Sequence, residues 1–169
     1  IKNAVTYEVC FSWNGSCPNS KTTMEGPGAA GVPQNLFKDA AWNHGTEVTS
    51  AALQTDPTVK IIFIRCGTYL LSNNFATGCN TGDVKSALDW VYLNKDKFNI
   101  GALVSPLGTT VPIGGTKPIV CDLNAVYVPS VVKLVSTGMA VIFPTGNHYN
   151  YTSIISPACV PGVLAISAI

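Results

Sequence analysis

The sequence predicts an α/β fold in which crossover helices connect the strands of a parallel β-sheet. Runs of β-branched and apolar residues at 59–64 and 139–143 are typical of strands buried on both faces. Between these two runs, apolar residues recur at helical spacing and indicate a helix: Val84, Ala87, Leu88, Val91 and Tyr92. Such strands and helices alternate along the chain, which favours a parallel sheet, and sites in these sheets form at the carboxyl ends of the strands.

The amino-terminal 40 residues are rich in Gly, Pro, Asn, Ser and Thr. They are expected to form loops with one short strand at 4–9. A helix is expected over 45–53, where Val48, Ala51 and Ala52 share a face, and Pro57 is its stop signal.

The remaining expected elements follow in order. They are a strand at 59–64, a loop at 67–82, a helix from about 83, a strand at 100–107, a helix at 124–137, and strands at 139–143 and 163–168. Asp83 is expected to cap the helix that begins near residue 83, and Gly138 is expected to end the helix at 124–137. Pro129 either kinks that helix or marks its first turn.

Composition limits the classes of function. The chain has 169 residues, 47% hydrophobic and 11% charged, with a net charge of +1. This is too apolar for a disordered tail, and no charge excess favours nucleic acid or an anionic membrane as partner. The apolar runs are far shorter than the roughly 20 residues of a membrane helix. We therefore expect neither a nucleic-acid partner nor a membrane partner.

Six cysteines favour disulfides and an exported protein, because their number is even and charged residues are few. The favoured pairs are Cys10–Cys17, Cys66–Cys79 and, by what remains, Cys121–Cys159. Many other pairings are possible from sequence alone, and buried free thiols in a cytosolic protein are the alternative. Neither a CxxC pair nor a Cys/His cluster indicates zinc, so no metal ligands are assigned.

His44 is the first candidate for chemistry. It stands in Asn43-His44-Gly45-Thr46 at the start of the helix predicted over 45–53. A histidine there can act as a general base, and Gly45 allows close approach of another group. A surface or capping histidine is the alternative. His148, in a polar loop, is expected to be only solvated.

Asn147 is the second candidate. It ends Phe143-Pro144-Thr145-Gly146-Asn147, which follows an apolar strand directly. An amide at the carboxyl edge of a sheet can donate a hydrogen bond to a developing oxyanion. An ordinary Asn-containing turn is the alternative.

The order of these segments resembles the subtilisin-like serine peptidases. The matching blocks are His44-Gly45-Thr46 with 60–62, Ala87 to Val91 with Leu107-Gly108, 132–141 with Gly146-Asn147, and 156–159 with 163–168. Residues 10–18 and 28–31 resemble an insertion found in some secreted bacterial members. The resemblance covers about residues 10–169 and depends on four blocks in the correct order.

The resemblance implies an incomplete subtilisin-like three-layer fold. Residues 1–169 would be a partial peptidase domain, with a loop-rich segment at 1–43 and an α/β core at 44–169. His44 matches the catalytic base and Asn147 the oxyanion donor. The residues implied to bind substrate are Leu103, Ser105, Pro106, Leu107, Gly108 and Gly146. The implied protein is a secreted serine endopeptidase with a polypeptide substrate and no cofactor; structural calcium occurs in the family, but no acidic cluster here assigns it.

Two parts of the triad do not match. No Asp-Thr/Ser-Gly motif precedes His44, and Asp39 lies in an expected loop. No Gly-Thr-Ser-Met motif occurs before Ile169. Either this is a piece whose remainder supplies both residues, as Ile1 and the apolar run 163–169 suggest, or it is a non-catalytic binding or structural module on the same scaffold.

Two prolines also depart from the family pattern. Pro106 removes a backbone N–H from the substrate-pairing segment, and Pro144 stands where small residues are usual. Both favour the non-catalytic module. A third hypothesis, a doubly wound nucleotide-binding domain, is weak because no GxGxxG or P-loop motif follows a predicted strand, and the glycine-rich segment 26–31 lies in a polar loop.

Overall fold

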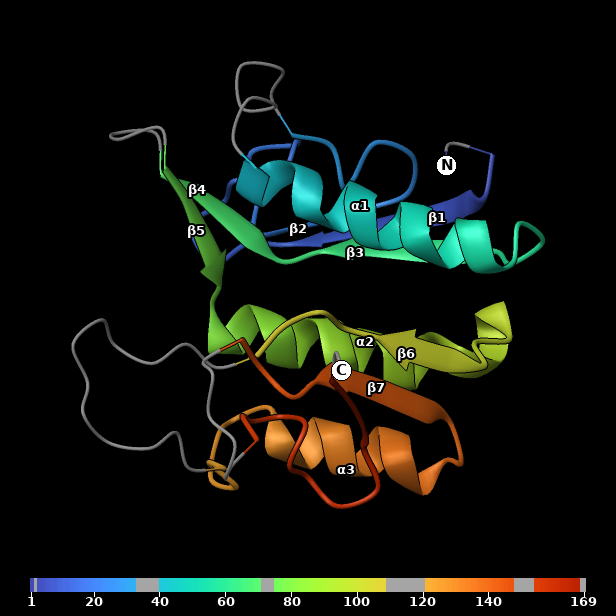
Figure 1. Cartoon of the computed structure of the whole chain (residues 1–169). Coiled ribbons are helices and arrows are strands. Elements are labelled where there is room, and N and C mark those ends of the chain that lie inside the picture. Colours follow the sequence, from blue (N-terminus) through green and yellow to red (C-terminus); the bar gives the residue numbers. More distant parts are fainter. Residues whose placement is uncertain (2, 33–39, 71–74, 109–120, 148–153, 168–169) are drawn as a thin grey trace. The chain divides into compact units, whose positions relative to one another are not determined.

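The structure is a computed structural model of an α/β protein, and it describes residues 1, 3–32, 40–70, 75–108, 121–147 and 154–167. Its helices are α1 (Ala40–Thr55), α2 (Thr81–Phe98) and α3 (Val128–Ser136) (Figure 1). Its strands are β1 (Val5–Phe11), β2 (Thr23–Glu25), β3 (Ile61–Arg65), β4 (Gly67–Leu70), β5 (Phe75–Cys79), β6 (Ala102–Val104), β7 (Ala140–Pro144) and β8 (Leu164–Ile166).

The chain divides into two compact units, Ile1–Ala87 and Leu88–Ile169, and the division falls within α2. In the first unit, β1 is the central strand of a three-stranded sheet. It pairs with β3 in parallel and with β2 in antiparallel orientation. Val9 and Cys10 of β1 are fully buried, so this strand forms the core of the unit.

Helix α1 lies between β2 and β3 in the chain and runs along their sheet (Figure 1). Gly45 makes this packing possible, because a Cβ at this position would lie 2.6 Å from Cζ of Phe63 in β3. The predicted close approach at Gly45 is therefore made by the protein's own sheet. The helix begins at Ala40, ahead of the predicted start, and β1 and β2 lie in the segment that was expected to be mostly loop.

A β-hairpin follows β3, so the prediction of a loop over 67–82 was wrong. β4 and β5 pair in antiparallel orientation, and the Cys66–Cys79 disulfide closes the open end of the hairpin with a Cα–Cα distance of 5.1 Å. Thr68, Tyr69 and Leu70 are residues that favour strands, but the pattern is too short to be recognised in isolation.

The second unit contains an all-parallel sheet in the order β6–β7–β8. Its core is formed by apolar side chains of α2, α3 and β7: Leu88, Trp90, Val91, Val131, Leu134, Val141 and Phe143. Ser130 of α3 donates a hydrogen bond of 2.6 Å to Asp89 of α2. This bond joins two helices whose buried faces supply most of the core.

Helix α3 begins at Val128, later than the expected start at 124, and its C-terminal end agrees with the predicted stop signal. Pro129 lies in the first turn, where its missing N–H costs no helical hydrogen bond. Gly138 adopts φ +80° after the last turn, and its N–H donates to the carbonyl of Val135 at 3.0 Å. Gly138 is therefore the predicted C-terminal stop of the helix.

All three predicted disulfides, Cys10–Cys17, Cys66–Cys79 and Cys121–Cys159, are confirmed. They indicate an oxidising environment. In the part of the chain that the structure describes, none of the helices has the length and apolar character needed to cross a membrane.

Candidate functional site

The residues predicted to bind substrate lie at the carboxyl ends of β6 and β7. Leu103 is in β6, and the N–H of Ser105 donates to the carbonyl of Ile142 at 3.0 Å, which continues the pairing with β7 past the strand end. Pro106, Leu107 and Gly108 follow, and the Pro106 side chain is exposed. The strand expected over 100–107 is shorter than predicted, Ala102–Val104, so Leu103 lies in β6 while the other predicted substrate residues follow β6 or β7.

Asn147 lies just beyond the carboxyl end of β7. Pro144 is paired with Ile166 of β8, and the N–H of Thr145 donates to the Ile166 carbonyl at 2.9 Å. Gly146 then turns the chain with φ +110°, a conformation that side chains rarely adopt. Asn147 is exposed, so its amide is accessible for hydrogen bonding.

Ile155 fills the space between the two strand ends. A Cβ added to Gly108 would overlap Cδ1 of Ile155, and a Cβ added to Gly146 would lie 3.0 Å from the same atom. Ile155 is 6% exposed, and its N–H donates to the Thr145 carbonyl at 3.1 Å. Both glycines are therefore required where the chain passes over this side chain.

A buried hydrogen bond holds the residue after Ile155. Ser156 is fully buried, and its hydroxyl accepts a hydrogen bond of 2.9 Å from the phenol of Tyr127. The Ser156 hydroxyl also contacts the carbonyl of Asp122 at 3.4 Å. Because Ser156 is already committed to these partners, it is not placed as a nucleophile.

His44 is exposed and lies one turn inside α1, because this helix begins before the predicted start. Among the described residues, none hydrogen-bonds to the His44 imidazole. His44 belongs to the unit Ile1–Ala87 and Asn147 to the unit Leu88–Ile169, so their expected meeting in one groove stays a prediction. Asp39 and His148 lie outside the described residues.

Ser12 directly follows β1, the strand that pairs in parallel with β3, the strand after the His44 helix. Its side chain is fully buried and forms hydrogen bonds with Asn14 at 2.9 Å and Ser16 at 2.6 Å. The N–H of Ser16 also donates to the Ser12 hydroxyl at 3.2 Å. Ser12 thus organises the loop that the Cys10–Cys17 disulfide closes, and no carboxylate stands at residues 9–13.

Asp83 has a role that differs from the predicted one. It lies inside the first turn of α2, and its carboxylate accepts a hydrogen bond of 3.0 Å from the backbone N–H of Trp13. Burial raises the pKa of Asp83, and the Trp13 hydrogen bond opposes this increase. Asp83 therefore anchors the segment after β1 and is not the N-cap of α2.

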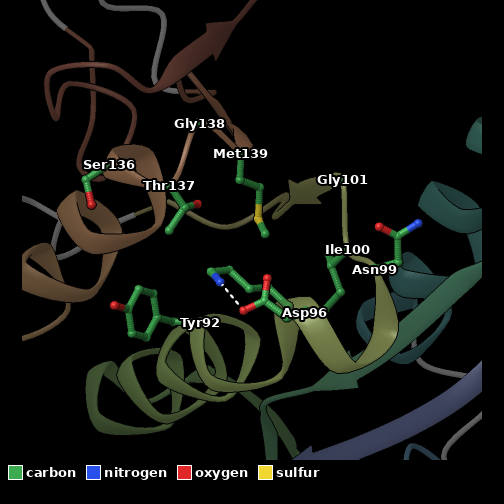
Figure 2. A pocket seen from close by; sticks show the side chains of 10 residues that line it. Tyr92, Asp96, Asn99, Ile100, Gly101, Ser136, Thr137, Gly138 and Met139 are labelled. Atoms are coloured by element: carbon green, nitrogen blue, oxygen red, sulfur yellow. Dashed lines mark hydrogen bonds and ion pairs between the residues drawn. The ribbon is translucent and has the colours of Figure 1, made fainter.

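A hollow of the second unit lies at the other end of its sheet. It has a volume of about 730 Å³ and lies next to Ile100-Gly101, before β6, and Gly138-Met139, before β7. Figure 2 shows Met139 pointing toward Asp96, which is paired with Lys95. The hollow is at the amino ends of the parallel strands, whereas ligands of such sheets bind at the carboxyl ends.

Comparison with known proteins gives no family assignment: no protein-family model matches the sequence, and a search of curated proteins returns no match. In the described residues, no group of three or more His, Cys, Asp or Glu side chains is arranged to hold a metal ion.

Two structurally important residues, Ser12 in the first unit and Ile155 in the second, were missed from the sequence. Ser12 was missed because the predicted strand 4–9 stopped short of the true end of β1 at Phe11. An apolar pair, Cys10-Phe11, continues that strand and could have indicated its end. Ile155 carries no sequence signal of its own, because only the fold brings it against Gly108 and Gly146.

Proposed function

We propose that this chain forms the part of a subtilisin-like serine endopeptidase domain that carries the catalytic histidine and the oxyanion-hole asparagine. The observation that carries the proposal is the arrangement of 105–108 and Gly146-Asn147 at the carboxyl ends of adjacent parallel strands. An extended polypeptide would pair with the segment from Leu103 to Gly108 and leave its scissile carbonyl near the exposed amide of Asn147.

In this proposal, His44 is the general base. Its exposed imidazole removes the proton of a serine hydroxyl that another segment of the same domain supplies, and then delivers that proton to the leaving amine. Asn147 donates a hydrogen bond to the oxyanion of the tetrahedral intermediate. Three disulfides support secretion into an oxidising medium as the setting of this activity.

The first experiment labels the full-length protein that contains this sequence with a fluorophosphonate. We expect labelling of a serine, its loss in His44→Ala, and its retention in Thr46→Ala, which alters an exposed neighbour on the same helix. Asn147→Leu should lower kcat by roughly 10²–10³-fold, a magnitude measured on subtilisin itself. Absence of labelling in the unmodified protein would reject the endopeptidase.

A non-catalytic polypeptide-binding domain on the same scaffold is the second candidate, and Ser12 favours it. The family's aspartate ends a strand upstream of the histidine helix. The upstream strand that pairs in parallel with β3, the strand after this helix, is β1, and it is followed by Ser12 in place of a carboxylate. Without this aspartate, the imidazole lacks the group that fixes its tautomer, and loss of that group costs about 10⁴-fold in kcat in a serine protease. This candidate predicts polypeptide binding together with no fluorophosphonate labelling.

A further inference from the structure

We propose that Ile155 sets the size of the side chain that this site accepts, so that the bound polypeptide must present a glycine or an alanine there. The inference rests on the proposed function, since it assumes that a polypeptide pairs with the segment ending at Gly108. It holds for either candidate, the endopeptidase or the non-catalytic domain, because it concerns binding and not bond cleavage.

The two glycines define where a ligand side chain would enter. Gly108 and Gly146 have no side chains of their own, so a depression would remain between the strand ends if nothing else filled it. Ile155 is in contact range of both positions, with its Cδ1, Cγ1 and Cγ2 atoms within 3.1 Å of the Cβ position of Gly146. The depression is therefore occupied by a side chain of the protein.

Ile155 is held in this position on both sides. Its own N–H is bonded to the Thr145 carbonyl at 3.1 Å, and the next residue is anchored by the Tyr127–Ser156 hydrogen bond at 2.9 Å. The side chain is 6% exposed, so a large ligand group could enter only by displacing it from packed surroundings. A methyl group needs far less displacement than a benzyl group.

The packing itself is tested by a double-mutant cycle on the 169-residue chain. We expect Gly108→Ala to lower the melting temperature, because the new Cβ collides with Ile155, and we expect Gly108→Ala to cause a smaller decrease in an Ile155→Ala background. Equal decreases in both backgrounds would show that Ile155 does not occupy this space.

Specificity is tested by binding of two fluorescent peptides, acetyl-Ala-Ala-Ala-Xaa amides in which Xaa is alanine or phenylalanine. The unmodified chain should bind the alanine peptide at least tenfold more tightly, and Ile155→Ala should reduce this preference to below threefold. Ile154→Ala is the matched control, since Ile154 is 38% exposed, and it should leave the preference unchanged.

The outcomes distinguish the size limit set by Ile155 from polypeptide binding itself. Equal affinity of the unmodified chain for both peptides overturns the size limit but leaves polypeptide binding in place. Failure of every variant to bind either peptide overturns both. Fluorophosphonate labelling of the full-length protein reports on catalysis alone and does not depend on Ile155.

Discussion

Arg65 is a charged side chain in the interior of the first unit, with 6% of its surface exposed. Its guanidinium donates to the carbonyls of Gly31 at 2.6 Å and Ser16 at 2.9 Å, and contacts the carbonyl of Gly67 at 3.4 Å. Burial lowers the pKa of Arg65. The guanidinium stays charged, because arginine does not lose its proton in proteins. Because the guanidinium is planar and carries several N–H donors, this one side chain can bond to the segments around Ser16, Gly31 and Gly67 at once.

Arg65→Lys tests this geometry. A single ammonium cannot reach the Gly31 and Ser16 carbonyls from two directions, so we expect a loss of about 2 kcal/mol of unfolding free energy, measured by urea denaturation. Lys60→Arg, at an exposed position of the same region, should have little effect. Equal stability of Arg65→Lys and the unmodified chain would contradict the assigned role.

Asp83 gives a pH-dependent prediction. Its pKa is raised by burial, so the folded state holds this proton more tightly than the unfolded state does. Unfolding free energy should therefore decrease as pH rises from about 3.9, the ordinary aspartate value, through the raised pKa. In Asp83→Asn this component disappears, because the amide does not ionise and its oxygen can still accept from Trp13.

The comparison of the two proteins is made by urea denaturation between acid and neutral pH. We expect the stability of Asp83→Asn relative to the unmodified chain to increase with pH across that range. Parallel stability curves for the two proteins would show that Asp83 does not contribute through its ionisation.

At the scale of elements, the contact between α1 and β3 depends on Gly45. Alanine is favoured over glycine in a helix by about 1 kcal/mol, yet a Cβ at this position would lie 2.6 Å from the ring of Phe63. Overpacking costs about 1–3 kcal/mol, so we expect Gly45→Ala to destabilise the protein despite its better helix propensity.

A second variant makes this prediction specific. In a Phe63→Leu background the obstructing ring is gone, so Gly45→Ala should become neutral or stabilising by thermal denaturation. If Gly45→Ala stabilises the protein in both backgrounds, α1 does not pack on β3 through this glycine.

Elements with a strong local signal could be predicted from the sequence, and those that depend on partners could not. Gly138 marked the end of α3, and Pro129 marked its first turn as one of two interpretations, because their backbone preferences act locally. The hairpin of β4 and β5 is short and has no recognisable turn pair, so its pairing emerges only in the fold.

The candidate site shows the same division. The position of Asn147 could be predicted, because a residue shortly after a buried parallel strand must lie at the strand's carboxyl end. Ile155 could not be predicted, since its contacts with Gly108 and Gly146 join residues that are distant in sequence. The same holds for Arg65, whose partners lie in two loops and at the start of β4.

At the scale of the whole molecule, the disulfides are divided between the units. Two lie in Ile1–Ala87, and Cys121–Cys159 is in Leu88–Ile169, where it spans 38 residues that include α3 and β7. Loop entropy predicts that replacing both cysteines of Cys121–Cys159 by alanine lowers the unfolding free energy by about 4 kcal/mol. The same replacement of the Cys66–Cys79 pair, which spans 13 residues, should lower it by about 3 kcal/mol. Chemical denaturation under non-reducing conditions measures both costs, and a larger loss from the shorter loop would contradict this account.

The proposed site also makes a prediction about the whole molecule. If His44 and Asn147 line one cleft, nitroxide labels at these positions should give a short and narrow distance distribution by electron paramagnetic resonance. Labels at Leu93 of α2 and Val132 of α3, two exposed residues of the same unit, provide a reference pair. A broad distribution for the His44–Asn147 pair would separate the two residues and remove the basis for a shared cleft.

The parallel pairing of β1 with β3 has a consequence for how the protein is made. The N–H of Ile61 donates to the carbonyl of Ala4, so β1 cannot complete its pairing until β3 has been synthesised. At ordinary rates of translation, β3 emerges from the ribosome roughly 3–10 s after β1. During that interval Val9, Cys10 and Phe11 have no completed core to enter, although they are buried in the finished fold. The nascent chain therefore exposes an apolar segment to solvent before its partner strand is made. A chaperone that shields this segment until β3 appears should raise the yield of folded protein.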